Sequence, residues 1–334
     1  TSYHYGSTVA AATFGLPESV GGKRNWDYRY TWIRDAAFTM YAFIRLGFTY
    51  EAGQFMKWIR TQFEKNIDHD TNLQLMYSID GEHKLDESEL GHLEGYQQSK
   101  PVRIGNNAYS QLQLDIYGEL MDSIYLYDKY GERITFDFWE KLVPQINYVC
   151  KNWEKEDHGI WEIRSETQQF IYSRVMCWVA VDRAVRLAEK RSFPYPLEYW
   201  RKTRDKIYKD IYYNFWNEEL QCFVQSKGSD IIDASVLLMP LVRYISPYDP
   251  RWQATLKKVE EELVTDTLVY RYNSEIYQDG IDGSEGTFSM CSFWYVECLA
   301  RGGQLEKGRL FFEKMLGYGN HLGLFAEQIG LRGE

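Results

Sequence analysis

The segment at residues 157–164 reads DHGIWEIR and places Glu162 directly after Trp161. A large aromatic neighbour desolvates a carboxyl group and favours its protonated form, which a general acid requires at mild pH. A Trp-Glu pair is weak evidence by itself, because a solvated surface glutamate is the commoner origin of such a pair. The sequence therefore offers Glu162 as a candidate acid whose assignment depends on where the segment lies in the fold.

A second isolated carboxylate occurs near the end of the chain. Residues 323–329 read GLFAEQI, so Glu327 is framed by apolar side chains. An apolar frame around one glutamate is unusual for a surface loop. A functional carboxylate is one explanation, and an accidental glutamate in a frayed chain end is the other.

Aromatic and charged residues alternate in the segment 25–36, which reads NWDYRYTWIRDA. Unpaired buried charges are costly, so these residues cannot all belong to an apolar core. One interpretation is a sugar site, with Trp32 as a platform for a sugar ring and with Arg34 and Asp35 as hydrogen-bonding partners of hydroxyl groups. The other is a satisfied Arg–Asp network beneath an aromatic lid.

Three further segments contain charged residues that are candidates for a site. Arg103 begins the run RIGNN, Arg271 lies in YRY, and residues 279–288 read DGIDGSEGTF. The last segment lacks the Lys-Ser/Thr pair of a phosphate loop. It predicts a tight turn that brings Glu285 to a helix start, where a carboxylate is a favourable cap.

Composition limits the classes of partner. The chain has 334 residues, with 38 Lys and Arg against 48 Asp and Glu, and its formal net charge is −10. This balance argues against nucleic acid, which is bound by clustered Lys and Arg. The chain contains no apolar run near the roughly 20 residues of a membrane span. The absence of a signal peptide favours a cytoplasmic location.

The aromatic residues and the cysteines bear on the type of ligand and on metal binding. The 11 Trp, 27 Tyr and 17 Phe must serve the core in part, and the rest could stack on sugar rings. The five cysteines contain no CxxC pair, and we expect free, buried thiols. Cys and His show no metal-ligand spacing. We therefore predict neither a cofactor nor a metal.

Apolar residues recur every three or four positions along most of the chain, which predicts helices. The predicted helices span residues 34–46, 50–64, 107–129, 137–153, 173–190, 196–214, 233–244, 250–263, 287–301 and 305–316. Short and long connections alternate strictly between them. Short links join antiparallel helix pairs, so the alternation puts every long connection at one end of the bundle.

The predicted fold is all-α, a barrel of paired antiparallel helices forming a single domain over residues 1–334. A helical solenoid would share the alternation of connections, but the sequence shows no repeat of fixed period. Six pairs require twelve helices, so ten suggest a barrel incomplete at both termini. The unusual segments fall on the long connections, where function is commonly located.

These segments resemble glycoside hydrolase family 15, the glucoamylase-like enzymes, particularly the prokaryotic branch. The resemblance rests on residues 24–38 (RNWDYRYTWIRDAAF), 101–106 (PVRIGN), 113–119 (QLDIYGE), 159–164 (GIWEIR), 285–294 (EGTFSMCSFW) and 324–328 (LFAEQ). They follow the family's order over nearly the whole chain. The family's N-terminal β-sandwich domain and opening helix do not appear in this sequence, nor does the helix that closes the barrel.

The resemblance implies an (α/α)6 barrel and an inverting, exo-acting α-glucosidase that releases β-glucose from α-1,4- and α-1,6-linked glucans. It assigns the general acid to Glu162 and the general base to Glu327. The contacts to the terminal glucose that it implies are Trp32, Arg34 and Asp35, with Trp161 and Arg271 in the same pocket and Arg103 as a weaker assignment.

Other functions remain open on this scaffold. An α,α-trehalase would use the same acid and base on a disaccharide. A related phosphorylase would replace the activated water by phosphate and would lack a base such as Glu327. A non-catalytic regulatory or sugar-binding domain would be expected to have lost a glutamate, and both are present. The expected partner is thus an α-glucan oligosaccharide or a disaccharide.

Overall fold

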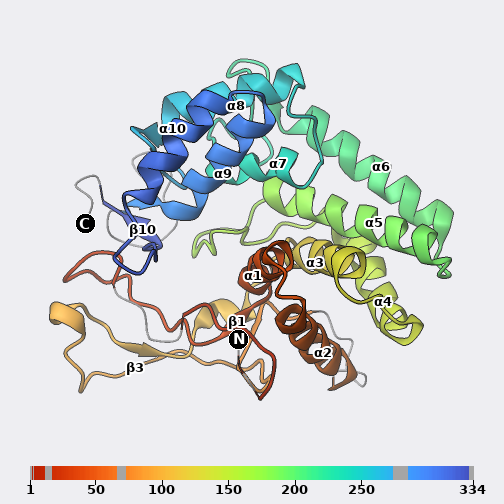
Figure 1. Cartoon of the computed structure of the whole chain (residues 1–334), viewed down its shortest axis with the longest axis horizontal. Coiled ribbons are helices and arrows are strands. Elements are labelled where there is room, and N and C mark those ends of the chain that lie inside the picture. Colours follow the sequence, from red (N-terminus) through yellow and green to blue (C-terminus); the bar gives the residue numbers. More distant parts are fainter. Residues whose placement is uncertain (1, 3, 12–16, 66–72, 274–284, 331–334) are drawn as a thin grey trace. The chain divides into compact units, whose positions relative to one another are not determined.

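The computed structural model describes residues 2, 4–11, 17–65, 73–273 and 285–330, and helices predominate in them (Figure 1). Each predicted helix has a counterpart. The α-helices of the described residues are α1 (Ile33–Leu46), α2 (Thr49–Lys65), α3 (Ile116–Tyr130), α4 (Phe136–Asn152), α5 (Ile171–Arg191), α6 (Leu197–Asn214), α7 (Leu238–Leu241), α8 (Pro250–Leu263), α9 (Ser289–Arg301) and α10 (Leu305–Leu316).

The alternation of short and long connections is confirmed. The links after α1, α3, α5, α7 and α9 are short, and those after α2, α4, α6 and α8 are long. Pro144 lies inside α4. Its missing N–H removes one bond of the helical ladder without ending the helix.

The third predicted helix begins too early. A short 3-10 helix, η2 (Asn107–Ser110), occupies its first turn, and α3 follows after a break. In the break the Leu114 N–H donates to the Asp157 carboxylate at 2.7 Å, and the Leu112 carbonyl accepts from the His158 N–H at 3.0 Å. These contacts use backbone groups that a continuous helix would need.

The seventh predicted helix is also divided. The 3-10 helix η3 (Ala234–Leu237) precedes the short helix α7. Pro240 offers no N–H to the helix, and Arg243 has a φ of +62°, in the left-handed region where a helix ends. Apolar periodicity alone could not show this end.

Short antiparallel strand pairs occur in the long segments and were not predicted. Two-residue strands are too short to show an alternating pattern. The pairs are β1 (Thr31–Trp32) with β2 (Met76–Tyr77), β3 (Ser88–Glu89) with β4 (Arg103–Ile104), β5 (Trp216–Asn217) with β6 (Cys222–Phe223), β7 (Val264–Thr265) with β8 (Leu268–Val269), and β9 (Thr287–Phe288) with β10 (Gln328–Ile329). A third 3-10 helix, η1 (Tyr96–Gln98), lies between β3 and β4.

The chain divides into two compact units. Unit 1 comprises Thr1–Glu162 and Ser173–Tyr208, and unit 2 comprises Ile163–Tyr172 and Lys209–Glu334. The organisation of residues 1–334 as a single domain stays a prediction. The predicted acid Glu162 belongs to unit 1 and the predicted base Glu327 to unit 2.

In unit 1, α1 and α3 lie side by side (Figure 1). Gly118 brings α3 close to α5, because a Cβ at this position would lie 2.2 Å from the Met176 carbonyl oxygen. Trp139 of α4 and Trp200 of α6 are fully buried and pack edge to face. These contacts form part of the core of unit 1.

In unit 2, α9 packs against α10, and α8 packs against β6. Trp252 of α8 is fully buried, and Thr255 accepts the Phe223 N–H at 3.0 Å. The strands β9 and β10 pair directly before α9. The five cysteines of the two units are free and buried, as predicted.

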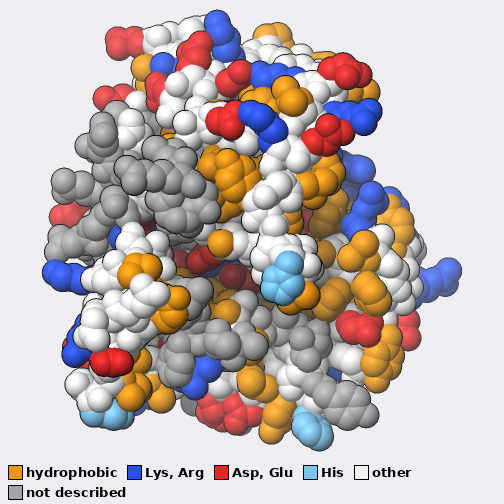
Figure 2. Space-filling model, turned by 60° about the vertical axis from the view of Figure 1, so that its left-hand side comes forward, with side chains coloured by type: hydrophobic (Ala, Val, Ile, Leu, Met, Phe, Trp, Pro, Cys, Tyr) orange, Lys and Arg blue, Asp and Glu red, His pale blue; other side chains and the backbone are white. Residues whose placement is uncertain are grey.

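One face of the molecule shows mixed charge. Basic and acidic side chains are interspersed on the face shown in Figure 2, which fits the net charge of −10. In the described parts of the chain, no helix has both the length and the apolar character needed to cross a bilayer.

Candidate active site

Glu162 ends a tight turn that leaves its backbone strained. Its N–H donates to the Gly159 carbonyl at 3.2 Å, and Gly159 has a φ of +65°. Glu162 itself has a φ of +55°, a conformation that residues with a Cβ rarely adopt. Such strain persists where surrounding contacts hold it, and it is concentrated at functional sites.

Two donors from the start of α1 hold the Glu162 carboxylate. The Trp32 indole N–H donates to Oε1 at 2.8 Å, and the Arg34 guanidinium donates to the same oxygen at 3.2 Å. The Glu162 side chain retains 22% of its exposure. Trp161, the aromatic neighbour in sequence, is half-buried, and the carboxylate of Glu162 is bound by donors from a distant segment.

Arg34 is the centre of this group. It pairs with Asp35 at 3.4 Å and donates to the Ile160 carbonyl at 3.0 Å and to the Gln113 side chain at 3.3 Å. Burial disfavours the guanidinium charge, but Asp35, Glu162 and Asp115 outweigh burial and raise the pKa of Arg34. Arg34 is thus a permanent positive charge shared among carboxylates.

The structure brings Trp32, Arg34, Asp35, Trp161 and Glu162 together in unit 1. Only 3% of Trp32 is exposed, and the indole acts as a donor to Glu162. The Asp35 side chain is 38% exposed, so its carboxylate can accept a hydrogen bond from a hydroxyl group. Their roles as glucose contacts stay predictions.

Two buried aspartates complete this neighbourhood, and sequence reasoning assigned them no role. Asp157 accepts the N–H groups of Leu114 at 2.7 Å and Gly159 at 3.2 Å, so it fixes the turn that carries Glu162. Burial and then the like charge of Asp115 raise the pKa of Asp157 to about 7. Asp115 lies directly before α3 in the QLDIYGE segment.

The other charged pair of the 25–36 segment is structural. Arg29 holds the buried Asp27 with two bonds of 2.8 Å, and Asp27 also accepts the Gly105 N–H at 3.3 Å. Burial favours the neutral acid, but these partners outweigh it and lower the pKa of Asp27. The Asp27–Arg29 pair is therefore a satisfied ion pair, and the interpretation of Trp32, Arg34 and Asp35 as a sugar site stays a prediction.

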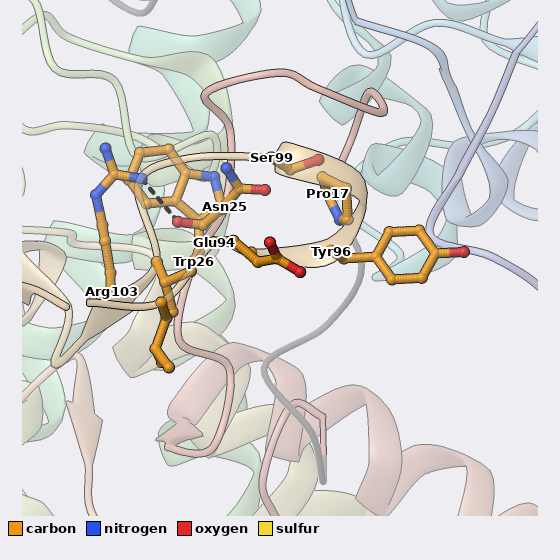
Figure 3. A pocket seen from close by; sticks show the side chains of 10 residues that line it. Pro17, Asn25, Trp26, Glu94, Tyr96, Ser99 and Arg103 are labelled. Atoms are coloured by element: carbon orange, nitrogen blue, oxygen red, sulfur yellow. Dashed lines mark hydrogen bonds between the residues drawn. The ribbon is translucent and has the colours of Figure 1, made fainter. Parts of the chain in front are cut away.

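Arg103 lines a separate feature of unit 1, a cavity of about 340 Å³ between the segment before α1 and the η1 region (Figure 3). Its guanidinium lies 4.6 Å from the centre of the Trp26 ring and donates to the Asn25 carbonyl at 2.7 Å. It also pairs with Glu87 at 3.2 Å. These contacts hold the cavity wall together, and the weaker assignment of Arg103 to substrate stays a prediction.

In unit 2, backbone contacts fix the segment of Glu327. The Ser289 N–H donates to the Glu327 carbonyl at 2.9 Å, and the Ser289 hydroxyl donates to the Ala326 carbonyl at 2.6 Å. The Thr287 hydroxyl donates to the Ile329 carbonyl at 2.7 Å. The Glu327 side chain is exposed at the start of β10.

Arg271 forms a charged group with Glu285 in the same unit. Its guanidinium approaches the Glu285 carboxylate at 2.7 Å, and the Tyr272 hydroxyl donates to the other oxygen at 2.9 Å. The prediction that Glu285 caps the following helix is wrong, because Phe288 occupies the cap position of α9 without a side-chain bond. An adjacent guanidinium binds a carboxylate more strongly than a helix end does. Part of the 279–288 segment lies outside the described residues.

Metal binding is not indicated by the parts of the chain that the structure describes. No group of three or more His, Cys, Asp or Glu there could hold an ion.

The fold is a helical scaffold shared with solved glycosidase structures. The structure matches a glycosidase over 97% of this chain and 81% of that one, with a TM-score of 0.76 and 17% identity. It matches a bacterial glucoamylase complexed with acarbose over 98% of this chain and 49% of that one, with a TM-score of 0.73 and 17% identity. The predicted all-α fold of the (α/α)6 class is confirmed.

Sequence comparison identifies the family. The model of glycosyl hydrolases family 15 matches residues 3–329. The chain belongs to this family, as its motifs predicted.

Three curated relatives are named trehalases. A trehalase of Mycobacterium tuberculosis is 42% identical over 97% of this chain and 48% of that protein. Trehalases of Thermoplasma volcanium and Sulfolobus acidocaldarius are 38% and 35% identical over 97% of this chain, and over 51% and 55% of their own lengths. The chain thus spans about half the length of the curated relatives it matches.

Proposed function

We propose that the protein hydrolyses α,α-trehalose by inversion, with Glu162 as the general acid and Glu327 as the general base. The observation that carries this proposal is the identity of 35–42% to trehalases over 97% of the chain. The sequence alone favoured glucan hydrolysis of the glucoamylase type and held trehalase as the alternative. The relatives support the alternative, since likeness to glucoamylase structures at 17% identity concerns the fold alone.

The reaction replaces one glycosidic bond by a bond to water. Glu162 donates its proton to the bridging oxygen as the bond between that oxygen and C1 breaks. Glu327 takes a proton from a water molecule, and the water oxygen attacks C1 from the opposite face. Inverting enzymes keep the two carboxyl groups roughly 6.5–9.5 Å apart to admit this water. One glucose leaves as the β-anomer and the other, the leaving group, as the α-anomer.

The donors around Glu162 support the acid role through the product of proton transfer. Once Glu162 has given up its proton it is a carboxylate, and the Trp32 indole and the Arg34 guanidinium are placed to stabilise that carboxylate. Charge-assisted hydrogen bonds of this kind are about twice as strong as neutral ones.

The remaining predicted contacts fit a small, hydroxyl-rich substrate. Asp35 is partly exposed beside Arg34, and this pair offers an acceptor and a donor to adjacent hydroxyl groups. In this proposal Arg271, with Trp161, lines the pocket of the same glucose unit. Its ion pair with Glu285 would hold the guanidinium in a fixed orientation.

A substrate panel tests the proposal. The whole protein is assayed on trehalose, maltotriose and isomaltose at equal concentrations, and kcat/KM is compared. We expect trehalose to exceed the others by about 100-fold or more, as expected where buried polar groups must all be matched. Preference for maltotriose would restore the glucoamylase-type function. No release of glucose from any of them would favour a regulatory or sugar-binding domain.

A further inference from the structure

Gln111 and Gln113 lie in the break between η2 and α3, and neither was assigned a role from the sequence. Gln113 is buried, with 1% of its surface exposed, and Gln111 is half-buried. A buried amide side chain needs hydrogen-bond partners for its oxygen and for its nitrogen. These two amides bond to each other, to Arg34 and to Glu162.

The bonds form a chain that runs from Arg34 to the backbone of Glu162. Arg34 Nη1 donates to Gln113 Oε1 at 3.3 Å, and Gln113 Nε2 donates to Gln111 Oε1 at 3.0 Å. Gln111 Nε2 then donates to the Glu162 carbonyl at 3.4 Å. A guanidinium only donates and a peptide carbonyl only accepts, so both ends of the chain require the same orientation of the two amides.

The chain closes into a ring through Glu162 itself. Arg34 Nη2 donates to the Glu162 carboxylate at 3.2 Å, while the chain of amides ends on the carbonyl of the same residue. Arg34 Nη1 also donates to the Ile160 carbonyl at 3.0 Å. Because a guanidinium is planar and rigid, the two bonds of Nη1 direct Nη2 toward the carboxylate. The ring therefore holds both the backbone and the side chain of Glu162.

The two ends of the turn that carries Glu162 have different supports. At its start, Asp157 accepts the N–H groups of Leu114 and Gly159. At its end, Gln111 holds the peptide of Glu162, whose φ of +55° is strained. A strained residue keeps its conformation only where surrounding contacts hold it. The backbone dihedrals of Glu162 set the direction of its Cβ, so the bond from Gln111 also helps to place the carboxyl group.

We propose that Gln111 and Gln113 are positioning residues that hold the carboxyl group of Glu162 within reach of the glycosidic oxygen. The inference rests on the proposed acid role of Glu162. Gln111 fixes the peptide of Glu162, and Gln113 joins Gln111 to the guanidinium that binds the carboxylate. The amides neither give nor take the transferred proton. They fix the geometry from which Glu162 gives it, and proton transfer requires that the acid lie within hydrogen-bond reach.

The test compares two substrates in the whole protein. Hydrolysis of trehalose needs a proton from the acid, whereas the leaving group of α-glucosyl fluoride needs none. Misplacement of Glu162 should therefore lower the ratio of kcat on trehalose to kcat on the fluoride, and Glu162→Gln sets the full size of that fall. Gln111→Met replaces the amide by an unbranched side chain and should lower the ratio by about tenfold, since a misplacement of about 1 Å costs up to 10²-fold. An unchanged ratio would overturn the inference.

A double-mutant cycle tests the chain of bonds itself. Gln113→Met removes the partner that orients Gln111, so it should lower the ratio about as much as Gln111→Met does. It also releases Arg34 and should slow both substrates, but the ratio isolates the part that is due to placement of the acid. The double variant should lose no more of the ratio than Gln113→Met alone, because residues of one network are not additive. Additive losses would show that the two glutamines act separately and would contradict the chain.

Gln62→Met is the matched control. Gln62 is also buried in unit 1, with 2% of its surface exposed, and donates to the Trp58 carbonyl within α2 at 3.1 Å. Its replacement should lower the melting temperature and leave the ratio unchanged. A fall in the ratio as large as that of Gln111→Met would mean general loosening of the unit and would contradict the positioning role.

The same assays separate this inference from the proposed function. A parent protein that turns over neither substrate would remove the proposed function and the inference with it. A parent active on both, with a reduced ratio in Glu162→Gln and an unchanged ratio in Gln111→Met, would remove the inference alone.

Discussion

The two predicted catalytic glutamates are held in different ways. In unit 1 the Glu162 carboxylate is bound by the side chains of Trp32 and Arg34, and its backbone is strained at a φ of +55°. In unit 2 the backbone on both sides of Glu327 is fixed by Ser289 and by the β9–β10 pair, and its side chain is exposed.

This difference matches what an acid and a base must do. An acid that gives up its proton needs donors ready to stabilise the carboxylate that remains, and Glu162 has them. A base that activates water must present a carboxylate oxygen to solvent, which an exposed side chain on a fixed backbone can do. Apart from the two glutamates themselves, the comparison predicts that neighbouring side-chain donors matter more at Glu162 and that backbone support matters more at Glu327.

The largest effect is expected at the base. Glu327→Gln keeps the shape and removes the proton acceptor, so kcat on trehalose should fall by about 10³-fold, within the usual contribution of a general base. Binding of trehalose, measured by calorimetry, should be retained. If the variant keeps near-parental kcat, Glu327 is not the general base. The contrast drawn between the two glutamates would then fail.

Replacement of the acid should depend on the leaving group. Glu162→Gln should lower kcat on trehalose by about 10²–10³-fold, the range for general acids, and should affect α-glucosyl fluoride by roughly tenfold or less. The matched measurement is Glu327→Gln on the same two substrates, where both rates should fall together. Equal losses for Glu162→Gln on both substrates would argue against an acid role.

The donor to Glu162 should have a smaller effect. Trp32→Phe removes one bond to a carboxylate, and a bond to a charged group contributes about 1.5–3 kcal/mol, so kcat should fall by at least tenfold. Trp200→Phe is the control, because its indole also donates at 2.8 Å, to Asn147. The control should lose stability and keep kcat. Equal kcat in the two variants would show that the Trp32 bond serves the fold alone.

The smallest effect is expected in the backbone support of Glu327. Ser289→Ala removes the bond to the Ala326 carbonyl, which contributes about 1 kcal/mol, and should lower kcat about two- to fivefold. Ser123→Ala removes a buried hydroxyl bond to the Glu119 carbonyl of α3 and should cost similar stability without changing kcat. The free energy of unfolding is measured by urea titration, and parental kcat in Ser289→Ala would show that this support is dispensable.

The fold could be predicted from the sequence largely because helices show in apolar periodicity. The early start predicted for α3 was wrong because Leu112 and Leu114 bond to the distant Asp157–His158 segment, which no local pattern reveals. The paired strands could not be predicted, because strands of two residues are too short to show an alternating pattern.

The site was predictable in its residue types and not in its contacts. The motifs singled out Glu162 and Arg34, but their bond joins residues 128 positions apart. Asp115 was part of a recognised motif, yet a polar residue before a helix usually indicates a cap. Only the structure shows that its side chain caps nothing and is buried beside Arg34.

The most direct test of the central claim is proton NMR of a fresh trehalose digest by the whole protein, read in the first minutes before mutarotation. An inverting trehalase releases one α- and one β-glucose from each substrate molecule, so equal anomeric signals at the outset are predicted. α-Glucose alone would mean retention and would contradict the pairing of Glu162 as acid with Glu327 as base.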